Sequence, residues 1–263
     1  MNHVYTVEYS VQTDEQPIDA VAFFLAASAK DALDQFQTFQ EQRHSKISVG
    51  YAQNNPSGSW PHFGVERLSL DNPDMVGAAV RFSVREGVPQ IIDCFAAHNV
   101  SIDIGLGHYY SVLEKAARRQ YSGAVVFLVQ QFFEQWGQWQ DPRDHKHAQD
   151  LVPLIFGYFL TGPETQICMQ KILLKLPHNQ LPVQEIVAGA YQTHNTVAIE
   201  VLEQQLSWEA LNTLNWDALL AISMPNGSCA LDGLLQRREQ MQQRLRLEQS
   251  VADVSSPSVK RKI

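Results

Sequence analysis

Cysteine, positive charge and long apolar runs are all scarce in this chain. The three cysteines, Cys94, Cys168 and Cys229, lie far apart without metal-ligand spacing, a pattern typical of buried thiols in a reducing compartment. The net charge is −8 and the pI is near 5.5, which argues against a large phosphate-binding surface, so we expect no nucleic-acid partner. No apolar run approaches the roughly 18 residues that a membrane-spanning helix needs, so we expect no membrane span.

Motifs for enzyme chemistry are also scarce. Residues 1–70 contain no Gly-rich phosphate loop and no Ser-His-Asp or Cys-His arrangement of recognisable spacing. The segment DPRDHKH, residues 141–147, has two histidines two positions apart, but a structural metal site needs further ligands, and an exposed insertion is the simpler interpretation. We therefore predict no catalytic residue, no cofactor and no metal. The N-terminus MNHVYTVEYS lacks the basic and apolar regions of a signal peptide, and we expect a cytoplasmic protein.

What the chain does contain is the composition of a folded protein, with 44% apolar and 18% charged residues among 263. Strand-like patterns occupy the beginning and helical patterns the rest, so we predict an α+β protein. Three parts are expected: a small α+β domain over 1–70, helical repeats with a terminal cap helix over 71–249, and a disordered tail over 250–263.

The first part is predicted to have the order strand, strand, helix, strand, strand. In HVYTVEYSV the aromatic and β-branched residues alternate with polar ones, which is typical of a half-buried strand. Ser28 followed by Asp31 resembles a capping box and predicts that a helix starts there. The four strand-like segments are residues 3–11, 20–27, 46–52 and 62–70.

The second part shows a repeat. The stretch from Ala78 to Asp103 and the stretch from Tyr110 to Phe132 each contain an apolar helix, a polar break and a second apolar helix. Equivalent apolar positions recur at spacings of 33, 41, 32 and 33, and they are Val80, Leu113, Leu154, Ile186 and Leu219. This period predicts about five helix pairs, which must stack to bury their apolar faces.

On these residues, the segment 78–235 resembles a degenerate ankyrin repeat array. Gly87 stands at the turn between the two helices, Asn99 stands where a Gly usually follows the second helix, and VLEKAARR is close to the ankyrin pattern PLHLAARN. The resemblance implies a solenoid of stacked helix pairs whose surface binds another protein. No unit has the full Thr-Pro-Leu-His tetrapeptide, and an irregular helical bundle or another helical repeat is the alternative. At the His place stand Arg81, Glu114, Ile155, Val187 and Leu220.

Several side chains are candidates for contact with a protein partner. A basic cluster surrounds the predicted turns, and aromatic residues of the kind enriched at interface hot spots follow the second repeat and occupy loop 53–61. The alternatives are a solvated face for the cluster, a cap on the core for the tryptophans at 136 and 139, and packing on the sheet edge for the one at 60. The candidates are Arg85, Arg118, Arg119, Tyr121, Trp136, Trp139 and Trp60.

The leading hypothesis is therefore a non-enzymatic protein–protein interaction protein. The polar C-terminal tail, ending in VKRKI, and the ankyrin resemblance also fit a bacterial effector or adaptor, including one secreted into a host cell. Two alternatives stay open at this point: an enzyme with a catalytic N-terminal domain and repeats that recognise substrate, and a structural subunit of a bacterial assembly.

Overall fold

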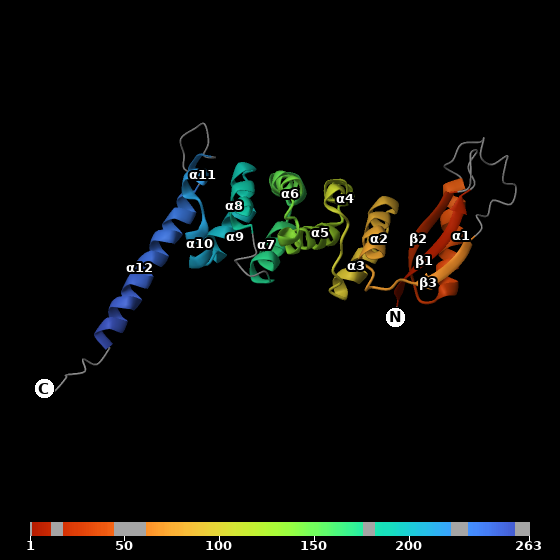
Figure 1. Ribbon diagram of the computed structural model, residues 1–263, viewed down its shortest axis with the longest axis horizontal. Coiled ribbons are helices and arrows are strands. Elements are labelled where there is room, and N and C mark those ends of the chain that lie inside the picture. Colours follow the sequence, from red (N-terminus) through yellow and green to blue (C-terminus); the bar gives the residue numbers. More distant parts are fainter. Residues whose placement is uncertain (1, 12–17, 45–61, 176–181, 222–230, 256–263) are drawn as a thin grey trace. The chain divides into compact units, whose positions relative to one another are not determined.

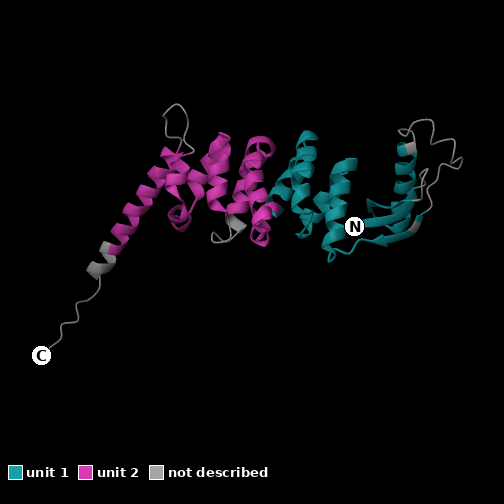
Figure 2. Ribbon diagram, turned by 45° about the horizontal axis from the view of Figure 1, so that its top comes forward, with its two compact units in different colours: residues 1–131 teal, residues 132–263 magenta. Residues whose placement is uncertain are grey.

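The computed structural model describes residues 2–11, 18–44, 62–175, 182–221 and 231–255. It contains a small three-stranded antiparallel sheet at the N-terminus followed by helices, which confirms the mixed α and β composition (Figure 1). The chain forms two compact units, residues 1–131 and residues 132–263 (Figure 2). None of the helices in the described ranges is long and apolar enough to cross a bilayer.

The sheet of unit 1 has the order β2-β1-β3, with β1 (His3–Val11) paired antiparallel to both β2 (Ile18–Ala26) and β3 (His62–Arg67). The alternation expected for β1 is present, since Val7 is fully buried while Glu8 is exposed. The opposite face is also partly covered. Thr6 is buried beside its cross-strand partner Phe23, whose ring lies 5.6 Å from that of Phe82 in helix α2 (Pro73–Glu86).

Helix α1 (Ala29–His44) packs against the face of the sheet that carries Val7 and Tyr9. The ring of Phe36 lies 5.0 Å from that of Tyr9, which fixes the helix on this face. The predicted cap is confirmed: the Asp31 N–H donates to Ser28 Oγ at 3.2 Å, and the Asp31 carboxylate accepts from the Ala27 N–H at 2.9 Å. The two satisfied N–H groups stabilise the start of the helix by about 1 kcal/mol.

Three of the four predicted strand segments can be compared with the structure, and 3–11, 20–27 and 62–70 correspond to β1, β2 and β3. The remaining segment, 46–52, lies outside the described residues, as does Trp60. The predicted boundary at residue 70 falls inside unit 1, where the sheet packs against helices that follow it in sequence. The division at 70 therefore stays a prediction.

Four helices complete unit 1: α2 (Pro73–Glu86), α3 (Gln90–Ala97), α4 (Leu106–Arg118) and α5 (Ser122–Glu134), whose last residues belong to unit 2. The turn predicted at Gly87 is confirmed, with φ of +84° immediately after α2. Asn99 follows α3 with φ of +49°, and Gln120, inside the RRQYSG break, follows α4 with φ of +58°. Residues in this left-handed region end helices by redirecting the chain.

Unit 2 contains η1 (Trp136–Gln138), α6 (Pro142–Leu154), the π-helix η2 (Ile155–Phe159), α7 (Glu164–Lys175), α8 (Val183–Gln192), α9 (Thr196–Gln205), α10 (Trp208–Thr213), α11 (Trp216–Ala221) and α12 (Asp232–Ser255). The segment 142–147, expected to be an insertion, is the exposed first part of α6. Helix α12 continues to Ser255, so residues 250–255 are helical instead of belonging to the tail. No proline interrupts the segment from Asp232 to Ser255, and the next proline is Pro257.

The backbone repeats the same closing bond at the end of several helices. The N–H of residue i+5 donates to the C=O of residue i from Val88 to Ser83, from Val100 to Phe95, from Tyr121 to Ala116, from Leu160 to Ile155 in the π-helix and from Asn195 to Ala190, at 2.8–3.0 Å. The acceptor Phe95 ends the second helix of the first pair, and the other accepting residues, 83, 116, 155 and 190, are 33, 39 and 35 positions apart. The sequence period therefore has a counterpart in backbone geometry.

Helices with equivalent places in the period pack on one another within each unit. In unit 1, α2 packs on α4, and in unit 2, α6 packs on α8 while α7 packs on α9 (Figure 1). Val80, Leu113, Ile186 and Leu219 are buried at their equivalent positions, and Leu154 is half-buried next to the fully buried Ile155. Burial at these positions is what the stacking of helix pairs within a unit requires.

Candidate binding surface

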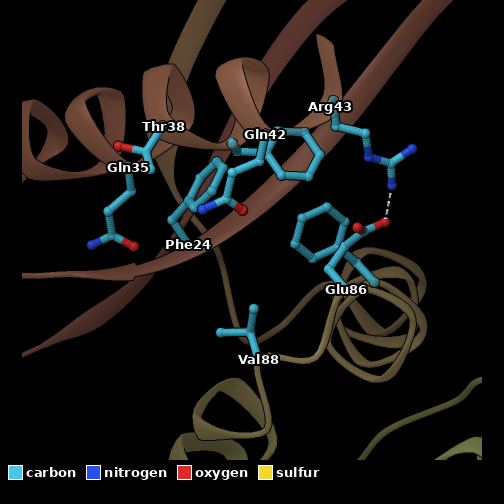
Figure 3. Close-up of a pocket in the computed structure, with 9 residues that line it drawn as sticks. Phe24, Gln35, Thr38, Gln42, Arg43, Glu86 and Val88 are labelled. Carbon is cyan, nitrogen blue, oxygen red and sulfur yellow. Dashed lines mark hydrogen bonds and ion pairs between the residues drawn. The ribbon is translucent and has the colours of Figure 1, made fainter. Parts of the chain in front are cut away.

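A groove of about 320 Å³ lies between α1 and the C-terminal end of α2 in unit 1. We call it the aromatic groove. Figure 3 shows the Arg43–Glu86 pair at one end, and Gln35 and Thr38 toward the other. Its lining residues are Phe24, Gln35, Thr38, Phe39, Gln42, Arg43, Phe82, Glu86 and Val88.

The helical period explains why α1 presents one polar face to the groove. Gln35, Thr38, Phe39 and Gln42 are spaced i, i+3, i+4 and i+7, so they lie along one side of α1. The Gln35 side-chain amide donates to the Leu25 C=O of β2 at 3.1 Å, which ties this side of the helix to the sheet. The result is a row of amide and hydroxyl groups beside an aromatic ring.

Three phenylalanines from three different elements form the apolar floor. The rings of Phe24 and Phe39 lie 5.9 Å apart, those of Phe39 and Phe82 5.8 Å, and those of Phe24 and Phe82 6.2 Å. Phe24 and Phe82 are buried, and Phe39 is half-buried. Centroid distances of this size are typical of favourable aromatic pairs, so the floor is a rigid packed cluster in which Phe39 carries most of the accessible ring surface.

One carboxylate joins two arginines at the rim. Glu86 pairs with Arg43 of α1, and also with the neighbouring Arg85, whose Nε lies 2.7 Å from the carboxylate. Partial burial by itself would raise the pKa of Glu86, but the hydrogen bonds from Arg43 and Arg85 outweigh it and leave the pKa below its ordinary value. Glu86 is therefore ionised near neutral pH.

Both guanidinium groups also lie over rings of the floor. The Arg43 guanidinium carbon is 5.2 Å from the centroid of Phe39, and that of Arg85 is 5.6 Å from the centroid of Phe82. Cation–π contacts of this kind contribute about 0.5–1 kcal/mol at exposed sites. Together with Glu86 they fix the two arginine side chains in position.

A second group of side chains continues from this rim, around the turn after α2. Arg119 Nη2 donates to the Arg85 C=O at 3.1 Å. A Cβ at Gly87 would lie 2.7 Å from Arg119 Nη1 and 3.3 Å from the Tyr121 hydroxyl, so both side chains cover the turn closely. We call Arg85, Arg119 and Tyr121 the arginine cluster. It joins the turns of two successive helix pairs, 33 positions apart.

The structure brings three of the seven predicted contact residues together, namely those of the arginine cluster. Arg118 lies close in sequence but pairs with Glu114 at 2.8 Å, and 77% of its side chain is exposed. Glu114 is one turn earlier on α4, so this pair is a surface ion pair within a single helix.

The two tryptophans belong to unit 2. Trp136 is buried, with its ring 5.9 Å from Phe132, 6.4 Å from Phe133 and 5.5 Å from the His145 ring. Trp139 is half-buried and its ring lies 4.9 Å from Phe132. Of the two, Trp139 has the larger exposed fraction for a contact with another molecule.

Sequence reasoning missed most of the aromatic groove. Arg43 and Glu86 are 43 positions apart, and no local pattern indicates that they meet. A signal was present on α1, where polar Gln35, Thr38 and Gln42 share a face with Phe39 at helical spacing. An amphipathic helix with aromatic and amide residues on one side would have identified one wall of the groove.

The two thiols in the described residues are poor candidates for reactive groups. Burial raises the pKa of Cys168 to about 12, and burial also raises the pKa of Cys94, so both thiols are neutral at physiological pH. Within the described ranges, no group of three or more His, Cys, Asp and Glu side chains could hold a metal ion.

Comparisons with protein-family models, with curated proteins and with solved structures found no match to this chain.

Proposed function

We propose that this protein is a non-enzymatic interaction protein that binds a partner protein through a surface made of the aromatic groove and the arginine cluster. The observation that carries the proposal is the arginine cluster. It fixes exposed guanidinium groups from two successive helix pairs around one turn, directly beside the rim of an aromatic groove. Arginine and tyrosine, both present in the cluster, are among the residues most enriched at interface hot spots.

The helix pairs themselves are proposed to be degenerate ankyrin-like repeats. Support comes from the repeated closing bond and from the packing of equivalent helices on one another in each unit. Further support comes from Arg81, which stands at the His place of the ankyrin tetrapeptide. Its guanidinium donates to the Ile104 C=O at 3.1 Å and so ties helix α2 to the loop that follows α3. Stacked repeats offer extended surfaces for protein partners.

We propose binding, and not catalysis, because the carboxylate of Glu86, in the described lining of the groove, is ionised and paired. Glu86 is held by two guanidinium groups, and its pKa lies below the ordinary value. A general acid or base works best with a pKa near the operating pH, and a paired carboxylate of this kind is poorly suited to exchange protons. Its role is to position the two arginines.

The setting that we propose from the ankyrin resemblance is a bacterial adaptor or effector. An adaptor acts by holding two molecules together, and its activity depends on surface residues such as those of the arginine cluster. A catalytic centre is not required for this role.

A variant pair tests the proposal. The full-length protein, tagged at one terminus, is used to capture partners from cells that express it, beside the double variant Arg85→Glu/Arg119→Glu. The matched control is Arg244→Glu on α12, because Arg244 is also an exposed arginine in an ion pair, with Glu248 at 3.1 Å. We expect wild type and Arg244→Glu to retain the same partner and the double variant to lose it. Retention by the double variant at wild-type level would contradict the proposal.

A further inference from the structure

We infer that the occupant of the aromatic groove is an acidic peptide segment of the partner, with one apolar side chain in the groove and carboxylates on the arginine cluster. This inference rests on the proposed function and names the chemistry that the surface recognises.

The local charge is opposite in sign to that of the whole chain. Arg43, Arg85 and Arg119 provide three positive charges around the rim and Glu86 provides one negative charge, which leaves two positive charges. The chain as a whole has a net charge of −8. An acidic segment is therefore repelled by most of the protein and attracted to this rim, which favours binding in one place.

The arginines have donors to offer such a segment. Arg85 uses its Nε–H for Glu86, Arg119 uses an Nη2–H for the Arg85 C=O, and a guanidinium group carries five N–H donors. The Arg85 side chain is 58% exposed although its position is fixed by Glu86 and Phe82. Guanidinium groups held in place in this way bind carboxylates with little loss of side-chain entropy.

The groove supplies the remaining two elements of peptide recognition. Phe39, with Phe24 and Phe82 behind it, is an aromatic contact for an apolar side chain. A volume of about 320 Å³ is at the small end for ligand pockets and is sufficient for such a side chain. The Gln35 amide already donates to the Leu25 C=O and to Asp31, and the Thr38 hydroxyl donates to the Asp34 C=O, so both side chains are held in place along the groove. Their oxygens can accept from the N–H groups of a peptide backbone.

A nucleic acid is the competing occupant, because arginines and aromatic rings also bind nucleotides. The observations favour the peptide. The rim carries two net positive charges, which match the few carboxylates of a short segment, whereas a nucleic acid brings one phosphate for every nucleotide and needs a larger basic surface.

The test uses defined probes with the full-length protein. The first probe is a short fluorescent peptide of Glu and Gly with a single central Phe. Three others are the same peptide with Phe→Ala, the same peptide with every Glu→Lys, and a single-stranded oligothymidylate. Fluorescence polarisation measures binding to wild type, Arg85→Glu, Arg119→Glu, the groove-filling variant Thr38→Trp and the control Arg244→Glu. Circular dichroism verifies that each variant is folded.

We expect saturable binding of the Glu/Phe peptide that weakens with added salt. Binding should weaken about tenfold or more when the peptide loses its Phe side chain. It should weaken by a similar factor in the protein variants Thr38→Trp, Arg85→Glu and Arg119→Glu, and it should be unchanged in Arg244→Glu. The Lys peptide should not bind. Absence of saturable binding, equal binding of the Lys peptide, tighter binding of the oligothymidylate, or insensitivity to both arginine variants would each overturn the inference.

The outcome is separable from that of the proposed function. If the peptides fail but Arg85→Glu/Arg119→Glu still abolishes partner capture, the binding surface stands and its chemistry is wrong. If the double variant captures the partner normally, the proposed function is wrong whatever the peptides do.

Discussion

Replacement of Gly77 by Ala tests how closely the helix pairs of unit 1 are stacked. Gly77 is buried in α2, and a Cβ at this position would lie 1.9 Å from the Asp103 carbonyl oxygen and 2.9 Å from its carbonyl carbon. Ordinary contacts of a Cβ begin near 3.4 Å, so the loop before α4 must move by about 1.5 Å. The obstacle is backbone, which cannot rotate away as a flexible side chain could.

Two opposing contributions decide the result. Alanine in a helix interior is favoured over glycine by about 0.5–1 kcal/mol. Overpacking costs about 1–3 kcal/mol, and movement of the loop also strains the hydrogen bond from Arg81 to the Ile104 C=O, which contributes about 0.5–1.5 kcal/mol. We expect Gly77→Ala to lower the free energy of unfolding by about 1–3 kcal/mol.

Gly107→Ala is the matched control. Gly107 is also helical, in the first turn of α4, but apart from its chain neighbours and the backbone of its own helix, nothing lies within 4 Å of the position that its Cβ would take. This variant should be as stable as wild type or more stable by up to about 1 kcal/mol. Urea unfolding followed by far-ultraviolet circular dichroism measures both. If Gly77→Ala is as stable as Gly107→Ala, with an unchanged denaturant slope, the close stacking of α2 on the loop is refuted.

Three further predictions concern other residues. Asn195→Ala should destabilise the protein by about 2–3 kcal/mol, because the side chain caps α9 at the Ala198 N–H and donates to the Phe156 and Leu160 C=O groups; urea unfolding within error of wild type would contradict this. The pKa of Glu86 is lowered in the folded state, so its stabilising contribution is complete above its ordinary value of 4.5 and is lost as the pH falls through the folded pKa. The difference in unfolding free energy between wild type and Glu86→Gln should therefore be constant near neutral pH and shrink below about 4.5, and a difference that grows with acidity would refute it. Cys168 should resist iodoacetamide in the native protein at about pH 8, because burial raises its pKa to about 12; mass spectrometry showing modification as fast as in urea would count against this.

Local features of the fold were predictable where the responsible residues are neighbours in sequence. The alternation of β1, the Ser28 cap and the positive φ values of Gly87 and Asn99 each depend on a few consecutive residues. Helix α10 was not predicted, although Ser207 is a typical residue for the start of a helix. In the structure the Ser207 hydroxyl caps this helix by accepting from the Ala210 N–H at 3.2 Å. A helix of this length gives too few apolar positions for its period to be recognised.

The candidate surface was predictable only in part. The arginine cluster was found because the period places the turns after α2 and α4 at equivalent positions, which suggested that their polar residues lie near each other. The burial of Trp136 was not evident, because its packing depends on Phe132, Phe133 and the His145 ring. Arg43 and Glu86 come together because α1 packs beside α2, and no pattern among neighbouring residues in the sequence predicts this packing.

The π-helix Ile155–Phe159 has a consequence for how this chain tolerates insertions and deletions. Adding one residue to an α-helix normally rotates everything beyond it by about 100°, which would turn an apolar face away from its neighbour. A single π-helical turn accommodates the added residue, so that the residues after it keep their original orientation toward the neighbouring helix. It leaves carbonyl groups in need of donors, and Asn195 supplies them at Phe156 and Leu160. Removal of one residue from this turn should therefore be tolerated better than removal of one from α8.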